Sequence, residues 1–381
     1  MVFELKLTYK FNNDEKKLNV DQKDYLIPET VEVFVKEGDA IYADTGDYVY
    51  VNQLLVESPT GIKTYATVAG TVERKQDSLL ITNDKTDSAM VGEDVLSSIE
   101  NVKKEEIISV CNELGISFDN RLIVNKLKAN SKVLVVNAMD IEPYQFNNNY
   151  LFQDNVKNIL DTINLISRRF NIDAYLLLNK YDDNNVYAVK TLIGGYPNIN
   201  FLVINDVFPY NTNGVIAKKF FKEYKPEEIL FLDTVSLFKI FVALKEKLPV
   251  TEKYITVVLD DPSNVYVVKT KYGANLKEAI TSTINPSFDN KDIFLNNFMR
   301  KVKCVNFDAL TVTDNIKSVF IFEKDDNVPS KCIKCGKCVD ICPMGLNPLS
   351  RKLDSACIRC GLCNFVCPAN RNLISREKDS L

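Results

Sequence analysis

Two cysteine runs near the C-terminus constrain this 381-residue chain more than any other feature. The first is Cys332-x2-Cys335-x2-Cys338-x3-Cys342-Pro343, and the second is Cys357-x2-Cys360-x2-Cys363-x3-Cys367-Pro368. This spacing is typical of bacterial ferredoxins with two [4Fe-4S] clusters, in which the fourth cysteine of each run binds the other cluster. It predicts one cluster on Cys332, Cys335, Cys338 and Cys367, and a second cluster on Cys357, Cys360, Cys363 and Cys342.

Other cysteine-rich sites fit these runs less well. Disulfide frameworks do not repeat such a run, and structural zinc sites use C-x2-C pairs separated by longer loops. Gly336 and Gly361 lie between ligands, where a missing Cβ lets the backbone approach sulfur and donate N–H bonds to it. Cys111 and Cys304 lie far from both runs, and we interpret them as small apolar residues rather than ligands.

The composition excludes several function classes. The chain contains no histidine, which rules out Ser-His-Asp catalysis, His-ligated haem or zinc, and Rieske centres. Its net charge of −4 gives no indication of nucleic-acid binding or of a polybasic membrane anchor. Thiolate-ligated iron and the absence of a signal-peptide pattern after Met1 favour a cytoplasmic location. The apolar stretch 229–244 is shorter than the ~20 residues that span a bilayer, so we expect no direct membrane insertion.

The hydrophobic patterns along the chain predict a multidomain α/β protein. Short β-rich runs separated by Gly, Pro and Asp turns occupy residues 29–84, in the order typical of a lipoyl-like barrel-sandwich. Strands and helices alternate from about residue 95 to 246, including one long helix over 151–170, which predicts a mostly parallel, helix-flanked sheet. A β-β-α unit follows, and we interpret residues 284–296 as a polar connection to a last strand at 318–322.

Four further strings resemble RnfC, a component of the Rnf electron-transport complex, and the resemblance covers nearly the whole chain. They are Asn137-Ala-Met-Asp-Ile-Glu-Pro-Tyr144, Phe208-Pro-Tyr210, Lys247-Leu-Pro-Val-Thr-Glu-Lys-Tyr-Ile-Thr-Val257 and Cys342-Pro-Met-Gly-Leu-Asn-Pro348. The resemblance implies four domains. They are a barrel-sandwich hybrid (1–92), a Rossmann-like α/β domain similar to the flavin-binding part of respiratory complex I (93–247), a β-grasp module of the soluble-ligand-binding type (248–325) and a two-[4Fe-4S] ferredoxin domain (326–381).

The chain departs from that family where members bind flavin mononucleotide (FMN) and NADH. The family's glycine-rich phosphate loop corresponds here to residues 112–121, in which only Gly115 remains and Glu113, Ile116 and Asp119 would crowd or repel a phosphate. Asn147–Asn149 replaces an acidic pair, and Asn211–Asn213 replaces a Gly-Gly-Glu turn. Glu142 would be the flavin-site acid if that site were kept, and otherwise a strand-end carboxylate that binds loop amides. We therefore expect two [4Fe-4S] clusters and neither FMN nor NADH.

These patterns predict an electron-transfer subunit or adaptor without an NADH–flavin active site of its own, as in the RnfC-like protein associated with proline reductase. The alternatives are a flavin-containing NADH dehydrogenase subunit and a non-redox scaffold with structural clusters. The expected partners are a ferredoxin or flavodoxin, a reductase, or membrane Rnf-type subunits. The chain would bind them in the cytoplasm or on the inner face of the cell membrane. An acidic partner surface would suit the cations around the cysteine runs: Lys331, Lys334, Lys337, Arg351, Lys352, Arg359 and Arg371.

Overall fold

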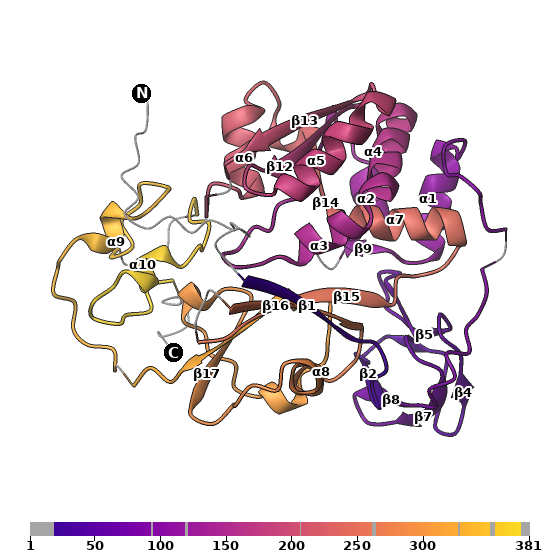
Figure 1. Cartoon of the computed structure of the whole chain (residues 1–381), viewed down its shortest axis with the longest axis horizontal. Helices are drawn as coiled ribbons and strands as arrows, with labels where there is room; N and C mark the ends of the chain where they lie inside the picture. The colour runs from indigo at the N-terminus through magenta and orange to yellow at the C-terminus, as the bar shows by residue number, and fades with distance from the viewer. Residues whose placement is uncertain are drawn as a thin grey trace.

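The protein is a mixed α/β assembly of several sheets, as predicted. The computed structural model describes residues 19–92, 94–118, 121–205, 207–260, 264–326, 328–350 and 355–374. A helix-rich unit lies above a five-stranded sheet, a small β unit lies at one end and the cysteine runs lie at the other (Figure 1). Asp119, Arg351 and Lys352, which the sequence analysis singled out, fall outside the described residues.

The N-terminal β unit consists of two small sheets around one apolar core. One sheet has the order β2 (Thr30–Phe34), β8 (Ser78–Asn83), β7 (Gly70–Arg74), β4 (Tyr48–Val49). The other has the order β3 (Ala40–Ile41), β5 (Leu54–Glu57), β6 (Lys63–Tyr65). Alternating side chains such as Val31 and Val33, or Leu79 and Ile81, point inward and form the core with Leu55 and Val72.

The α/β unit contains a parallel sheet in the order β13 (Ile199–Ile204), β12 (Asp173–Asn179), β11 (Val133–Asn137), β14 (Ile229–Asp233). Helices α1 (Lys104–Glu113), α2 (Ile123–Leu127), α4 (Val156–Phe170), α5 (Asp183–Leu192) and α7 (Thr234–Glu246) share one core with this sheet, and α6 (Asn213–Phe220) covers the opposite face. The chain first builds strands on one side of β11 and then adds β14 on the other. The carboxyl ends of β11 and β14 therefore form a topological switch point, where open α/β sheets bind ligands.

The long helix predicted over 151–170 is two helices. α3 (Asn147–Asp154) ends at Asn155, whose φ of −133° and ψ of 25° are not helical, and α4 begins at the next residue. The Asn155 side chain donates to Leu151 O at 3.1 Å and accepts from Asn158 Nδ2 at 3.2 Å. Asparagine breaks the helix here because its amide competes for local hydrogen bonds.

The five-stranded sheet joins segments from both ends of the chain. Its order is β1 (Asn19–Tyr25), β16 (Asn264–Lys271), β15 (Glu252–Val258), β18 (Ser318–Glu323), β17 (Lys291–Leu295). Helix α8 (Leu276–Thr283) covers one face, and Phe146 and Leu151 of the α/β unit pack on the other. The predicted division assigned residues 19–25 to the first domain, whereas β1 pairs in parallel with β16 over its whole length.

Residues 284–296, identified in the sequence only as a polar stretch, contain the strand β17. Its polar side chains are satisfied by ion pairs, with Lys291 bound to Glu323 at 2.6 Å and Asp292 bound to Lys303 at 2.7 Å. Lys291 and Glu323 are also cross-strand partners, so the charges support the pairing. An edge strand of this kind has little apolar alternation and is hard to distinguish from a loop in sequence.

The cysteine segment, residues 328–350 and 355–374, has two one-turn helices and little core of its own. Helix α9 (Lys337–Asp340) follows the first two cysteines of one run and contains the third, and α10 (Leu362–Phe365) takes the same place in the other. In the described ranges, no helix is both long and apolar enough to cross a bilayer. The apolar stretch 229–244 divides between β14 and α7.

Candidate iron–sulfur site and interdomain cavity

The eight cysteines of the two runs gather around two small cavities. Cys332, Cys335 and Cys338 line the first cavity together with Cys367, the last cysteine of the other run. Cys357, Cys360 and Cys363 line the second cavity together with Cys342. Each group therefore contains the four thiols that the crossed ferredoxin pattern assigns to one cluster.

The two loops present their backbone to sulfur in the same way. Lys334 N–H donates to Cys332 Sγ and Arg359 N–H donates to Cys357 Sγ, both at 3.4 Å. Both donors have left-handed backbone conformations, with φ of 57° and 52°. Hydrogen bonds of this kind favour the thiolate over the thiol, which is the form that binds iron.

Burial works against the thiolate in the second group. It raises the pKa of Cys360 to about 11 and the pKa of Cys363 to about 12. These thiols stay protonated at neutral pH until a metal displaces the proton, so metal loading would release protons. Among the described residues, no three Cys, Asp or Glu side chains converge on a single-ion position. A [4Fe-4S] cube makes no such demand, because each of its thiolates binds a different iron.

The two groups differ in how they meet the rest of the protein. Around the first group, Cys335 is exposed and Ile333 is 66% exposed. Around the second, Gly361 is buried against the short 3-10 turn Phe298–Arg300. A Cβ added to Gly361 would lie 2.7 Å from the carbonyl carbon of Met299 and 2.8 Å from Arg300 N, whereas one added to Gly336 would meet nothing nearer than Asp340 Oδ2 at 3.9 Å. We call the first the outer group and the second the inner group.

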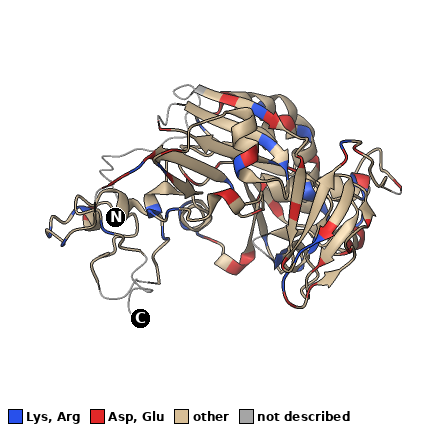
Figure 2. Ribbon diagram, turned by 90° about the horizontal axis from the view of Figure 1, so that it is seen from below, with Lys and Arg blue, Asp and Glu red and all other residues tan. Residues whose placement is uncertain are grey.

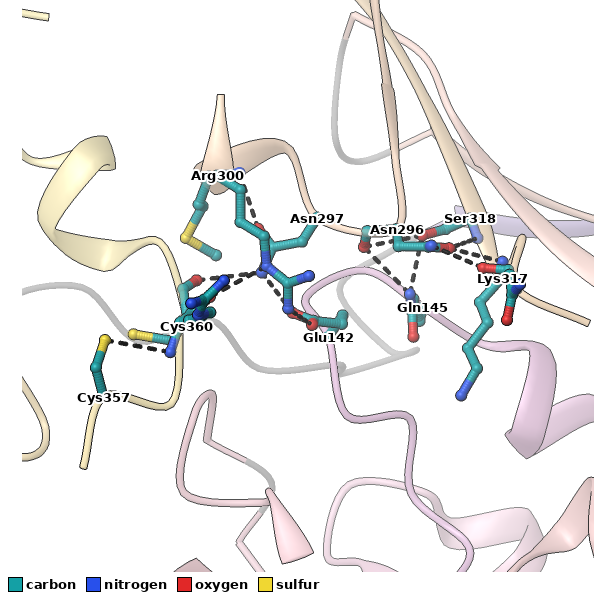
Figure 3. A network of polar contacts seen from close by, with 12 residues as sticks. Glu142, Gln145, Asn296, Asn297, Arg300, Lys317, Ser318, Cys357 and Cys360 are labelled. Carbon is teal, nitrogen blue, oxygen red and sulfur yellow. Dashed lines mark hydrogen bonds and ion pairs between the residues drawn. The ribbon is translucent and has the colours of Figure 1, made fainter. Parts of the chain in front are cut away.

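Glu142 connects the inner group to the α/β unit (Figure 3). Its carboxylate accepts from Asn297 Nδ2 at 2.5 Å and pairs with Arg300 Nη2 at 2.7 Å. Asn297 Nδ2 also donates to Cys360 O, and Arg300 Nε donates to Arg359 O, both at 3.1 Å. Burial raises the pKa of Glu142, and Arg300 and Asn297 oppose that shift. Glu142 therefore binds an amide and a guanidinium of a neighbouring unit.

Asp140 holds the loop that presents Glu142. Its two carboxylate oxygens accept the N–H groups of Asn148 and Asn149, at 3.0 and 3.1 Å, in the first turn of α3. Burial raises the pKa of Asp140 to about 7, although these hydrogen bonds oppose the shift. Asn149 Nδ2 in turn donates to Asp182 Oδ2 at 2.6 Å. The asparagines that replace the family's acidic pair thus form a buried polar network behind the loop.

A cavity of about 290 Å³ lies at the switch point, between the α/β unit and the five-stranded sheet. Glu142 and Arg300 line one part of it, and Lys239, Lys253, Asp314 and Lys317 line another. Lys239 Nζ lies 2.8 Å from both carboxylate oxygens of Asp314, and Lys253 Nζ donates to Thr313 O at 2.6 Å. The sequence analysis did not find this charged wall. Its one signal was Lys239, a cation within an otherwise apolar helix.

In the segment predicted to replace the family's phosphate loop, the first N–H groups after α1 are already bonded within the chain. The N–H groups of Leu114, Gly115 and Ile116 each donate at 3.0 Å to carbonyls of α1. A Cβ on Gly115 would lie 2.6 Å from both Gly61 O and Lys63 N, and Lys63 Nζ donates to Glu113 O at 2.7 Å. Residues 114–116 therefore close α1 and pack on β6, and these three residues do not fit a phosphate cradle.

Comparisons with known proteins agree with the resemblance drawn from sequence. A family model described as "4Fe-4S binding domain" matches residues 329–345, which include the whole first run. The C subunit of the ion-translocating oxidoreductase complex of Buchnera aphidicola subsp. Acyrthosiphon pisum (strain APS) is 24% identical over 278 residues, which cover 66% of this chain. The chain spans 58% of the length of that relative. The resemblance to RnfC is thus confirmed for a divergent sequence.

Solved structures of an NAD+-reducing [NiFe]-hydrogenase also align with part of the chain. The air-oxidized and H2-reduced forms each give a TM-score of 0.45 at 12% identity. The alignments cover 58% and 61% of this chain, and 47% and 49% of the hydrogenase chains.

Alanine at the two equivalent glycines should have unequal effects. Gly336 and Gly361 have similar φ values, 79° and 85°, so alanine imposes a similar backbone strain at both positions. Only Gly361→Ala also drives a Cβ into the backbone of Met299 and Arg300, which should cost a further ~1–3 kcal/mol. Hydrogen exchange at residues 298–300 and 362–365 should accelerate in Gly361→Ala and stay close to wild type in Gly336→Ala. Equal protection in the two variants would contradict the docking of the inner group.

Proposed function

We propose that this chain, which is similar to RnfC, is an electron-transfer subunit or adaptor that passes single electrons through two [4Fe-4S] clusters. The observation that carries the proposal is the crossed grouping of the cysteines, three from one run with the fourth from the other. Cys332, Cys335, Cys338 and Cys367 would hold the outer cluster, and Cys357, Cys360, Cys363 and Cys342 the inner one. A [4Fe-4S] cluster supplies one-electron chemistry without a bond to substrate.

The surroundings of the two groups suggest different roles. The outer group lies near solvent, where a partner protein can approach Cys335 and Ile333. The inner group is covered by the 3-10 turn at Phe298–Arg300 and lies beside residues that also line the switch-point cavity, Glu142 and Arg300. We therefore assign exchange with an external carrier to the outer cluster and exchange within the assembly to the inner cluster.

An acidic carrier suits the outer group. Lys331, Lys334 and Lys337 are all exposed beside it, and the ribbon at this end of the molecule carries blue Lys and Arg positions in Figure 2. Positive charge around a redox centre steers an acidic partner and raises its association rate. A ferredoxin or flavodoxin, an acidic reductase, or subunits of an Rnf-type membrane complex would meet this requirement. The chain would work in the cytoplasm, alone or bound to the inner face of the membrane.

The cavity supports a second candidate function, a flavin-containing NADH dehydrogenase subunit. It lies at the switch point, where α/β proteins bind nucleotides, and cations line one wall. Against this candidate, the N–H groups of Leu114, Gly115 and Ile116 are bonded to α1, and the side chain of Ile116 is buried. The carboxylate of Glu142 is also already paired with Arg300. We favour an α/β unit that keeps the fold and binds no FMN.

The purified protein should contain about eight irons per chain, with the broad ~400 nm absorption of two cubane clusters. Cys335→Ser should lower the iron to about four, because it removes one ligand of the outer cluster only. Iron analysis and EPR after reduction measure both expectations. A variant that keeps all its iron would contradict the ligand assignment. Wild-type clusters that a low-potential ferredoxin cannot reduce would favour the non-redox scaffold.

Calorimetric titration with FMN should show no binding at micromolar concentration. The physical reason is that a phosphate needs several free N–H donors in one loop, and those of Leu114, Gly115 and Ile116 are occupied. Riboflavin, which lacks the phosphate, is the matched control ligand. Micromolar binding of FMN would overturn this expectation and promote the dehydrogenase candidate.

Reversing Lys334 and Lys337 to glutamate should slow electron exchange with an acidic carrier several-fold at low salt. Steering is electrostatic, so the difference from wild type should shrink as salt rises and the Debye length falls to ~8 Å at physiological ionic strength. The control carries the same charge change at Lys36 and Lys75, which are exposed on the N-terminal β unit at the opposite end of the molecule. Stopped-flow rates measure the effect, with iron content as a check on folding. Equal slowing by both double variants would count against a localised docking surface.

A further inference from the structure

One buried hydroxyl next to the inner group lacks a partner. Tyr210 Oη is inaccessible to solvent and forms no hydrogen bond within the described part of the chain. Buried hydroxyl groups in proteins are nearly always hydrogen-bonded, so an orphaned one indicates a group that completes the site.

The loop that carries Tyr210 packs on the inner group. Phe208 lies in one apolar cluster with Met299, Ile341 and Leu362. Ile341 precedes Cys342, and Leu362 lies between Cys360 and Cys363, so this contact brings the loop to three cysteines of the inner group. The loop is fixed from its other side, because Asn137 Nδ2 donates to Asn211 O at 3.0 Å and Asn211 Nδ2 donates to Asp140 O at 2.9 Å.

Two of these cysteines lie within electrostatic range of the hydroxyl. Burial, followed by negative charge on Cys360 and Cys342, raises the pKa of Tyr210 to about 12. Both cysteines belong to the inner group, and they come from different runs. A phenol is protonated in the neutral range, so its O–H can donate toward an electron-rich acceptor.

We propose that the Tyr210 hydroxyl donates a hydrogen bond to a sulfur of the inner [4Fe-4S] cluster and thereby raises the reduction potential of that cluster. Reduction adds one negative charge to the cluster, and a donor aimed at sulfur stabilises the reduced state more than the oxidised state. No proton is transferred. Tyr210 is thus a tuning residue for the inner cluster, and this role rests on the proposed function.

The alternative hydrogen-bond partner of the Tyr210 hydroxyl is a water molecule. Thr212 Oγ1 is also buried without a partner among the described residues, and a water between it and Tyr210 Oη would satisfy both. In that arrangement the tyrosine would be structural, and its removal would leave the cluster potential unchanged. A cluster sulfur and a water molecule as partners of Tyr210 therefore predict different results in one experiment.

The test is Tyr210→Phe in the full-length, cluster-loaded protein. Phenylalanine keeps the ring and removes only the hydroxyl. At a fixed solution potential, the reduced-to-oxidised ratio of the inner cluster should fall about three- to tenfold, and tenfold equals ~59 mV for one electron. The outer cluster should not change and serves as an internal control. EPR-monitored redox titration measures both, and Cys357→Ser identifies the signal of the inner cluster.

A second readout detects the hydrogen bond itself. Electron–nuclear double resonance of the reduced wild-type protein should show an exchangeable proton coupled to the inner cluster, and that coupling should be absent in Tyr210→Phe. Tyr187→Phe is the matched control, because Tyr187 is 74% exposed on α5. The potential and the coupling should be unchanged in this control.

Three outcomes would overturn the proposal: an unchanged inner-cluster potential, an unchanged proton coupling, or loss of the inner cluster from Tyr210→Phe. The last would make the hydroxyl a requirement for assembly rather than a tuning group. Iron analysis of the wild type comes first. If it finds no inner cluster, the proposed function fails independently of Tyr210.

Discussion

The contacts of Glu142 hold the functional end of this protein together. One buried carboxylate in the loop that follows β11 binds Asn297 and Arg300 from the loop that follows β17. The same two residues reach on to the backbone of Cys360 and Arg359. Three units that are far apart in sequence thus meet in one polar network. A buried charge is stable only when it is paired and hydrogen-bonded, so the network is specific for one mutual arrangement of the units.

This arrangement makes two nearly identical sequence repeats unequal. Both runs have the same cysteine spacing, the same glycine position and the same N–H to sulfur hydrogen bond. They differ in what lies outside them, since one loop faces solvent and the other packs on Met299 and Arg300. Reduction potentials of iron–sulfur centres respond to solvent exposure and to hydrogen bonds on sulfur. If both groups bind clusters as proposed, this asymmetry of the surroundings would give the two clusters different potentials.

The switch-point cavity combines the geometry of a ligand site with charged walls that pair with one another. Strand order alone places a crevice at the carboxyl ends of β11 and β14. Its walls are now held by the protein's own charges, with Lys239 bound to Asp314 and Glu142 bound to Arg300. Internal pairing of this kind rigidifies the contact between the α/β unit and the five-stranded sheet. It also occupies Lys239 and Glu142, two of the charged groups that line the cavity.

The sequence by itself determined the features that depend on neighbouring residues. Cysteine spacing defines which thiols can share a cluster because a loop of two residues between ligands has few conformations, and strand–helix alternation predicts a parallel sheet because each crossover needs a helix. Only the tertiary structure decided the pairing of β1 with β16, the edge strand β17, the contacts of Glu142 with Asn297 and Arg300, and the packing of Phe208 beside the inner group. Glu142 and Arg300 are 158 residues apart, and no local pattern encodes such a pair. These contacts arise from the way whole units pack, which depends on the shape and charge of complete surfaces rather than on the order of residues within one segment.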